Sequence, residues 1–255
     1  MSLAEKVLKK TRYKHDQRVH NTNDAEILVP HFISLTNPES VVDVGCGLGT
    51  FLKVFKEHGV TNVVGIEGQW LDKNKTLLEP AEMVTANLEK PLRLEQRFDL
   101  AICLEVAEHL REESSEEFVR SLTGLSDYII FSAGIPYQGG QNHINEQWPS
   151  WWAERFEKEG YSFYDVIRPQ IWNNDKLFWW YKQNIFLIIN DKVAHQFKKE
   201  EIMDMVHPDL FSFKAGKLNN IVTGKYDLPS YIKHLLFGIL MLPRNLYVGI
   251  KRMLS

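Results

Sequence analysis

Short hydrophobic runs alternate with amphipathic segments through the middle of the chain. The runs that predict strands span residues 41–45, 62–67, 83–86, 98–104 and 128–132. Residues 50–58 and 112–125 have helical periodicity, and a shorter helical piece is expected at residues 70–78. Strands that alternate with helices predict a parallel sheet covered by helices on both faces.

The same pattern extends in both directions. A helix is expected at residues 24–35, another at 149–160, and two further strands at 162–167 and 184–189. We therefore predict a doubly wound α/β domain. In this division an N-terminal helical cap covers residues 1–39, the α/β domain covers residues 40–191, and an extension covers residues 192–255.

Composition places the chain among ordinary globular proteins. Of its 255 residues, 44% are hydrophobic and 25% are charged, which excludes a wholly disordered chain. Uncharged stretches fall short of the roughly 20 apolar residues that a membrane span needs. The first ten residues have no apolar core of a signal peptide, and Cys46 and Cys103 both fall in expected core segments. We expect a cytoplasmic protein without a disulfide framework.

Charge is distributed unevenly along the chain. The net charge is −3, which argues against nucleic acid as the main partner. Residues 228–255 contain four basic and no acidic side chains, so they carry +4 and the preceding residues carry −7. Beyond Pro243 the apolar positions of this tail share one helical face. Such a basic amphipathic helix can lie on an anionic membrane surface, pack on the domain, or contact a second subunit.

The run Val-Val-Asp-Val-Gly-Cys-Gly-Leu-Gly-Thr, residues 41–50, is the most informative part of the sequence. A buried strand ends in three alternating glycines and leads into a helix, so the backbone can approach a ligand closely. Glu67 ends the next strand, where doubly wound folds place an acid that binds ribose hydroxyls. A dinucleotide site would prefer a third glycine at Thr50, whereas the order here is G-x-G-x-G.

This turn resembles motif I of the class I S-adenosylmethionine-dependent methyltransferases. The resemblance continues at Thr85-Ala86-Asn87-Leu88 and at residues 97–110, which include Glu-Val-Ala-Glu-His. It implies a Rossmann-like seven-stranded sheet, S-adenosylmethionine as cofactor and S-adenosylhomocysteine as product. Asn87 departs from the family, where an aspartate is commoner. The implied cofactor-binding residues are Asp43, Gly45, Cys46, Gly47, Gly49, Glu67, Gly68, Asn87, Leu88 and Glu105.

The segment after the last central strand looks like a subset of these enzymes that we associate with glycan and small-metabolite modification. It contains Gly-Gly followed by His-Ile-Asn-Glu-Gln-Trp at residues 143–148. An alcohol acceptor must lose a proton, and a histidine can take it at neutral pH. We predict His143 as this base, with Glu146 orienting it or holding the substrate, although both could simply brace the loop. His109 is a weaker candidate, because this histidine accompanies unrelated acceptors across the family.

Other features narrow the chemistry. The fourth strand is not followed by the motif N/D-P-P-Y/F, and its absence argues against methylation of base or glutamine nitrogens. We therefore prefer an oxygen as the atom that receives the methyl group, while an amine nitrogen stays open. No H-x-x-x-H, C-x-x-C or carboxylate cluster is visible, so no metal is expected. Trp148, Trp172 and Tyr137 are candidates for a substrate wall, whereas Trp152 and Phe156 share a helical face that predicts core packing.

Three classes of function remain open from the sequence. The leading one is a methyltransferase that acts on a hydroxyl of a glycan precursor or small metabolite. The alternatives are a nicotinamide-dependent oxidoreductase, disfavoured by Thr50, and a non-catalytic protein that binds the cofactor and a partner. Subunit number is not fixed by any of these patterns.

Overall fold

The computed structural model describes residues 21–72, 74–194 and 202–223, together with residues 197, 225 and 232. The described residues through His207 form one compact unit, and those from Pro208 onward belong to a second. The first unit therefore extends beyond residue 191, where the sequence suggested the end of the α/β domain. Most of the basic tail, residues 228–255, lies outside the described residues.

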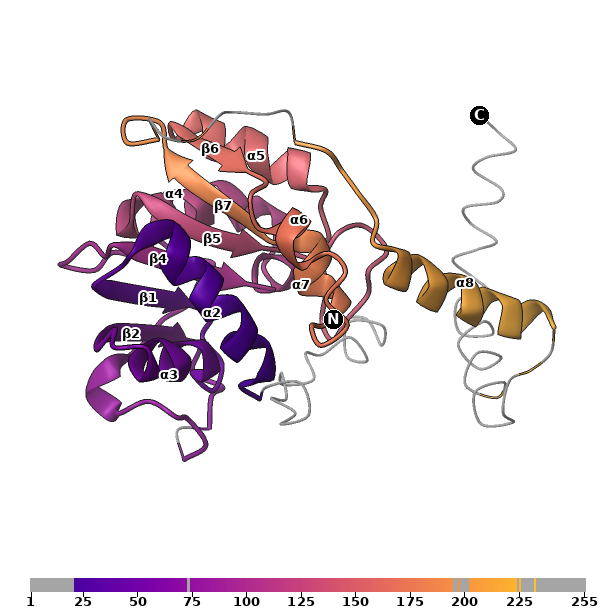
Figure 1. Ribbon diagram of the computed structural model, residues 1–255, viewed down its shortest axis with the longest axis horizontal. Helices are drawn as coiled ribbons and strands as arrows, with labels where there is room; N and C mark the ends of the chain where they lie inside the picture. The colour runs from indigo at the N-terminus through magenta and orange to yellow at the C-terminus, as the bar shows by residue number, and fades with distance from the viewer. Residues whose placement is uncertain are drawn as a thin grey trace, which may run out of the picture. The chain divides into compact units, whose positions relative to one another are not determined.

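The first unit is built on a seven-stranded sheet with the order β3-β2-β1-β4-β5-β7-β6 (Figure 1). Neighbours among the first five strands are parallel, whereas β7 is antiparallel to both β5 and β6. The strands are β1 (Ser40–Val44), β2 (Asn62–Glu67), β3 (Met83–Thr85), β4 (Leu100–Leu104), β5 (Tyr128–Ser132), β6 (Tyr161–Tyr164) and β7 (Phe186–Asn190). The predicted doubly wound α/β fold is confirmed.

Helices cover both faces of this sheet, each over its own hydrophobic cluster (Figure 1). On one face lie α2 (Asn23–Thr36), α3 (Thr50–Glu57), α6 (Arg168–Ile171) and α7 (Trp179–Asn184). On the other lie α4 (Ser115–Leu125) and α5 (Pro149–Lys158). Trp152 and Phe156 of α5 are buried in this second cluster, as their spacing predicted.

One sequence prediction is wrong, and one strand has a direction that the sequence did not predict. The five strands predicted to be parallel are parallel, whereas β7 lies between β5 and β6 in the opposite direction. A hydrophobic run buried on both faces reads the same in either direction, so its pattern carries no sign of this. Residues 70–72 and 74–78 form turns, bends and irregular backbone instead of the expected helix. There Leu77 donates a backbone hydrogen bond to Leu48, and Leu78 packs beneath Gly49, so the segment follows the glycine turn.

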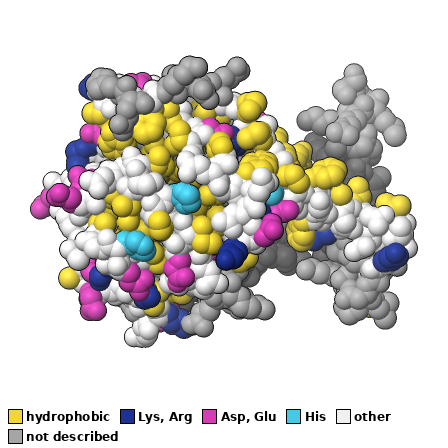
Figure 2. All heavy atoms as spheres, in the orientation of Figure 1, with side chains coloured by type: hydrophobic (Ala, Val, Ile, Leu, Met, Phe, Trp, Pro, Cys, Tyr) yellow, Lys and Arg dark blue, Asp and Glu magenta, His cyan; other side chains and the backbone are white. Residues whose placement is uncertain are grey.

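Within its described residues, the first unit also contains three short 3₁₀ helices: η1 (Pro80–Glu82), η2 (Ala107–His109) and η3 (Glu112–Ser114). The second unit contains α8 (Pro208–Val222), which was not predicted. Several apolar side chains of α8 are exposed, among them Phe211, Leu218 and Val222, and hydrophobic side chains are visible along it in Figure 2. Within the described residues, no helix is long and apolar enough to cross a membrane.

Candidate functional site

The glycine turn lies at the carboxyl end of β1 and leads into α3. Gly45, Gly47 and Gly49 have φ angles of 85°, 54° and 81°, in the left-handed region that glycine adopts without strain. A Cβ atom on Gly45 would lie 2.4 Å from Cγ2 of Val106. The φ angle and the close contact with Val106 therefore both require glycine at position 45. Both features are expected of a turn whose backbone approaches a ligand.

Glu67 ends β2 beside this turn and is only 6% exposed. Its Oε2 accepts a hydrogen bond from the Gly47 amide at 2.9 Å, and its Oε1 accepts one from the Gly68 amide at 2.7 Å. Burial raises the pKa of Glu67, while hydrogen bonds from Gly68, Gly47 and the Trp70 side chain oppose the rise. Each carboxylate oxygen has a second lone pair, so the group can still accept hydrogen bonds from a ligand.

Trp70 was not predicted as part of the site. Its indole ring lies over Gly68, where an added Cβ would come within 2.3 Å of the ring. The side chain is 40% exposed and hydrogen-bonded to Glu67. An aromatic residue in an otherwise polar turn was a signal in the sequence for a role in the site, and the prediction did not use it.

Asp43 lies on β1, one residue before the strand ends, and is 5% exposed. Within the described part of the chain, its carboxylate accepts no hydrogen bond. Burial raises the pKa of Asp43 well above its usual range, and the nearby Glu67 raises it further. A buried acid without a partner fits a ligand that brings a positive charge, such as the amino group of a methionine moiety.

We therefore expect the Asp43 side chain to lower the free energy of unfolding of the ligand-free protein. Its raised pKa means that the folded chain binds more protons, so the free energy of unfolding falls as pH rises from about 3.9 through the raised value. We expect Asp43→Asn to gain stability relative to wild type between pH 4 and pH 8, as measured by urea unfolding. Asp175→Asn, at an exposed position, is the control. A stability difference between Asp43→Asn and wild type that does not change with pH would contradict this reading.

The remaining predicted cofactor residues have different positions. Cys46 is buried with its sulfur close to Gly65, so only its backbone can face a ligand. Asn87 is exposed, and its Oδ1 accepts a hydrogen bond from the Glu89 amide in a turn. Leu88 is buried in the hydrophobic cluster under α4 and α5.

Glu105 follows β4 with a φ angle of 54°, uncommon for a residue other than glycine. Its two carboxylate oxygens accept hydrogen bonds from Gln138 and Asn184, at 2.9 and 3.0 Å. Gln183 extends this buried amide network by donating to Asn184. The network joins the end of β4 to α7 and to the loop after β5. The sequence reasoning missed these amides, because they are distant in sequence and have no motif.

His143 lies in that loop, close to Glu146. Its Nδ1 is 2.9 Å from Oε1 of Glu146, as the predicted orienting contact requires. The Gly139 amide also donates to this carboxylate. Amides of Ile144 and Asn145 both donate to the carbonyl of Glu108, which fixes the loop against η2. The Nδ1 contact leaves Nε2 as the nitrogen that can act on a ligand.

Gly140 provides the space that the His143 ring occupies. A Cβ at Gly140 would lie 2.0 Å from Nε2 of His143, so the ring would have to move. Since a misplacement of about 1 Å can cost roughly 10²-fold in rate, we expect Gly140→Ala to slow the methyl transfer that the sequence predicts by about that factor, without weakening cofactor binding. Gly124→Ala, which meets no atom within 4 Å, is the control in the same assay. Equal rates for the two variants would show that the ring position does not matter.

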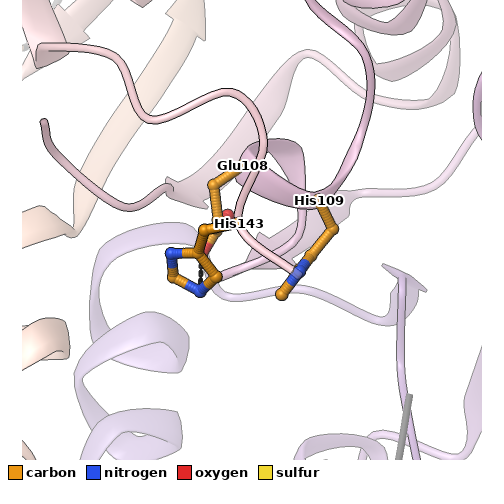
Figure 3. A group of neighbouring side chains, drawn as sticks. All are labelled: Glu108, His109 and His143. Carbon is orange, nitrogen blue, oxygen red and sulfur yellow. Dashed lines mark ion pairs between the residues drawn. The ribbon is translucent and has the colours of Figure 1, made fainter. Parts of the chain in front are cut away.

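Two further groups surround His143 (Figure 3). The His109 ring meets the His143 ring edge to face, with centroids 4.8 Å apart. Burial, followed by the charge of His143, lowers the pKa of His109 to about 4, so it is a poor base at neutral pH. Glu108 is fully buried, and its Oε1 lies 3.9 Å from Nε2 of His143.

Trp148, Trp172 and Tyr137 were predicted to form a substrate wall. Within the described residues, no contact joins these three side chains into one surface. Trp172 packs on the His207 ring, with centroids 4.5 Å apart, and its carbonyl contacts Nε2 of the same histidine. Trp148 is half-buried at the start of α5. Tyr137 is 87% exposed, with a φ angle of 67°.

Residues 19–167, more than half of the chain, match a protein family described as a methyltransferase domain. The chain belongs to this family. The matched segment includes the glycine turn, Glu67, Glu105 and His143. The recognition of a class I S-adenosylmethionine-dependent methyltransferase is thereby confirmed, and S-adenosylmethionine is its cofactor. The nicotinamide alternative is not supported.

Solved structures of methyltransferases are similar to this chain at low identity. The methyltransferase domain of a bacterial CtHen1 is 17% identical, with 66% of this chain and 97% of that one covered and a TM-score of 0.49. Magnesium protoporphyrin IX methyltransferase from Synechocystis PCC 6803, with bound S-adenosylhomocysteine, is 14% identical, with 73% and 92% covered and a TM-score of 0.48. No curated protein matches significantly.

Proposed function

We propose that this methyltransferase transfers the methyl group to a hydroxyl oxygen of a glycan precursor or small metabolite, and that His143 activates that hydroxyl. The observation that carries the proposal is the His143–Glu146 pair. It lies in the loop that follows β5, beyond the carboxyl end of the strand, where open α/β sheets bind their ligands.

The residues present fit the cofactor. S-adenosylmethionine supplies the methyl group from a sulfonium centre, and an in-line displacement transfers it. Asp43 is a buried acid that can pair with the cofactor's amino group, and Glu67 retains lone pairs for ribose hydroxyls. The glycines of the turn allow the backbone to approach the cofactor between these two acids.

The contacts of His143 support a role in proton transfer. Its Nδ1 lies 2.9 Å from Oε1 of Glu146, and in the tautomer in which Nδ1 donates to that carboxylate, Nε2 can accept the proton of an acceptor hydroxyl. Glu146 also stabilises the imidazolium that forms once the proton is taken. His109 is disfavoured as the base by its lowered pKa of about 4.

A screen of acceptors tests this function directly. The full chain is incubated with S-adenosylmethionine and a panel of nucleotide sugars, other hydroxylated metabolites and matched amines, and products are examined by mass spectrometry. We expect a gain of about 14 Da, one methylene, on a hydroxylated compound. Methylation of amines alone would replace the proposal with N-methylation.

A further inference from the structure

The side chain of Glu108 is in an unusual environment. It is 0% exposed, yet within the described residues neither of its carboxylate oxygens accepts a hydrogen bond of ordinary geometry. A buried carboxyl group that lacks such hydrogen bonds is costly, and a bound ion is one of the features that account for it in folded proteins.

Two imidazoles lie beside this carboxylate. One nitrogen each of His109 and His143 and one oxygen of Glu108 all lie within 4.8 Å of one another. Figure 3 shows Glu108 and His143 directed toward each other, with His109 next to them. Ligand atoms around a tetrahedral cation lie roughly 3–3.5 Å apart, given bonds of about 2.1 Å, so a small inward movement would complete the site.

We propose that Glu108, His109 and His143 bind one divalent cation of the first transition series, such as Mn²⁺ or Zn²⁺, and that the acceptor oxygen completes its coordination. The proposal rests on the proposed methylation of a hydroxyl, but the cation takes over the activation of that hydroxyl, and His143 then serves as a ligand instead of as the base. Two imidazoles and one carboxylate favour these ions over Mg²⁺ or Ca²⁺, which prefer oxygen ligands.

The surroundings of the three side chains resemble the supporting contacts of a metal site. Oε1 of Glu146 lies 2.9 Å from Nδ1 of His143. A carboxylate that contacts the second nitrogen of a histidine ligand commonly fixes the orientation of the imidazole ring and raises the basicity of the ligating nitrogen. The carbonyl of Glu108 fixes the loop through Ile144 and Asn145, so the ligands on η2 and on the loop are held together.

The reaction balances without any oxidant or reductant. A hydroxyl bound to the cation loses its proton to water more readily. Its oxygen then forms a bond to the methyl carbon, while the sulfur–carbon bond breaks and its electron pair stays on sulfur. The side chain of His143 is 11% exposed, so the cluster is partly open to an acceptor.

Cation binding can be measured without knowing the acceptor. The full chain, free of any affinity tag and stripped with a chelator, is titrated with Mn²⁺, Zn²⁺ and Mg²⁺ by calorimetry. Co²⁺ absorption in the visible range reports nitrogen and oxygen ligation. We expect one equivalent of Mn²⁺ or Zn²⁺ per chain and weaker binding of Mg²⁺. Glu108→Gln and His143→Gln should each weaken binding by more than the roughly 10–100-fold expected for Glu146→Gln, an outer-shell change.

Controls separate this site from adventitious binding. His58→Ala and Glu112→Gln remove an exposed histidine and an exposed acid, and both should bind the cation as wild type does. S-adenosylhomocysteine binding confirms that each variant is folded, and two variants at separate ligands keep the test valid if one unfolds.

Equal affinity in wild type, Glu108→Gln and His143→Gln, or no binding at all, would overturn the proposal. If methyl transfer then persists in chelator, the hydroxyl reaction with His143 as base still stands. Cation binding with methylation of amines alone would overturn the proposed function instead.

Discussion

Replacing His143 by alanine is expected to slow methyl transfer by about 10²–10⁴-fold, the contribution typical of a positioned base. The affinity for S-adenosylhomocysteine should not change, because Asp43 and Glu67 lie on β1 and β2, and in the described residues the side-chain contacts of His143 are with Glu146, Glu108 and His109. Turnover is measured with the acceptor from the screen, and cofactor affinity by calorimetry.

Two companion variants sharpen this prediction. Glu146→Gln keeps the shape of the orienting residue but loses its charge, so we expect a smaller loss of rate than for His143→Ala. His58→Ala removes an exposed histidine and should have the rate of wild type. Near-normal turnover by His143→Ala would mean that the histidine only braces the loop.

Replacing Trp152 by alanine is expected to lower the free energy of unfolding by about 3–5 kcal/mol. The side chain is 1% exposed and meets the rings of Phe131 and Trp151 edge to face, with centroids 5.4 and 4.8 Å away. Removing it leaves a large cavity between α5 and the sheet. Urea unfolding of the full chain measures the change.

Trp152→Phe is the matched variant for this prediction. Within the described residues, Nε1 of Trp152 is buried without a hydrogen-bond partner, so phenylalanine removes a polar group as well as volume. We expect it to cost clearly less than alanine. Equal losses for the two variants would indicate that packing of the ring contributes little.

Sequence alone predicted the ends of the central strands well, because each hydrophobic run is bounded by a glycine or a polar turn. It also placed Asp43, the glycine turn and Glu67 at one end of the sheet, since parallel strands that end together bring their last residues together. Orientation of His143 was one of two roles that the sequence suggested for Glu146, and the two side chains are in contact.

The parts that sequence could not predict depend on contacts between distant segments. Glu105 is bound by Gln138 and Asn184, which belong to a loop and to α7. The spacing of these three residues in the sequence does not predict that their side chains form a hydrogen-bond network. The cluster of Glu108, His109 and His143 was missed because its members follow no metal-binding spacing, and a loop from another strand brings the third residue in. The turn at residues 70–78 was missed because Leu77 and Leu78 pack against the glycine turn rather than within a helix.

The most direct test of the whole account is a calorimetric titration of the full chain with S-adenosylhomocysteine, next to the same titration with NAD. We predict one site for S-adenosylhomocysteine and no heat with NAD. Glu67→Ala should weaken binding by roughly 10–100-fold, because hydrogen bonds to a charged group contribute about 1.5–3 kcal/mol, while Glu112→Ala should bind as wild type does. Binding of NAD alone, or an affinity unchanged by Glu67→Ala, would contradict the account.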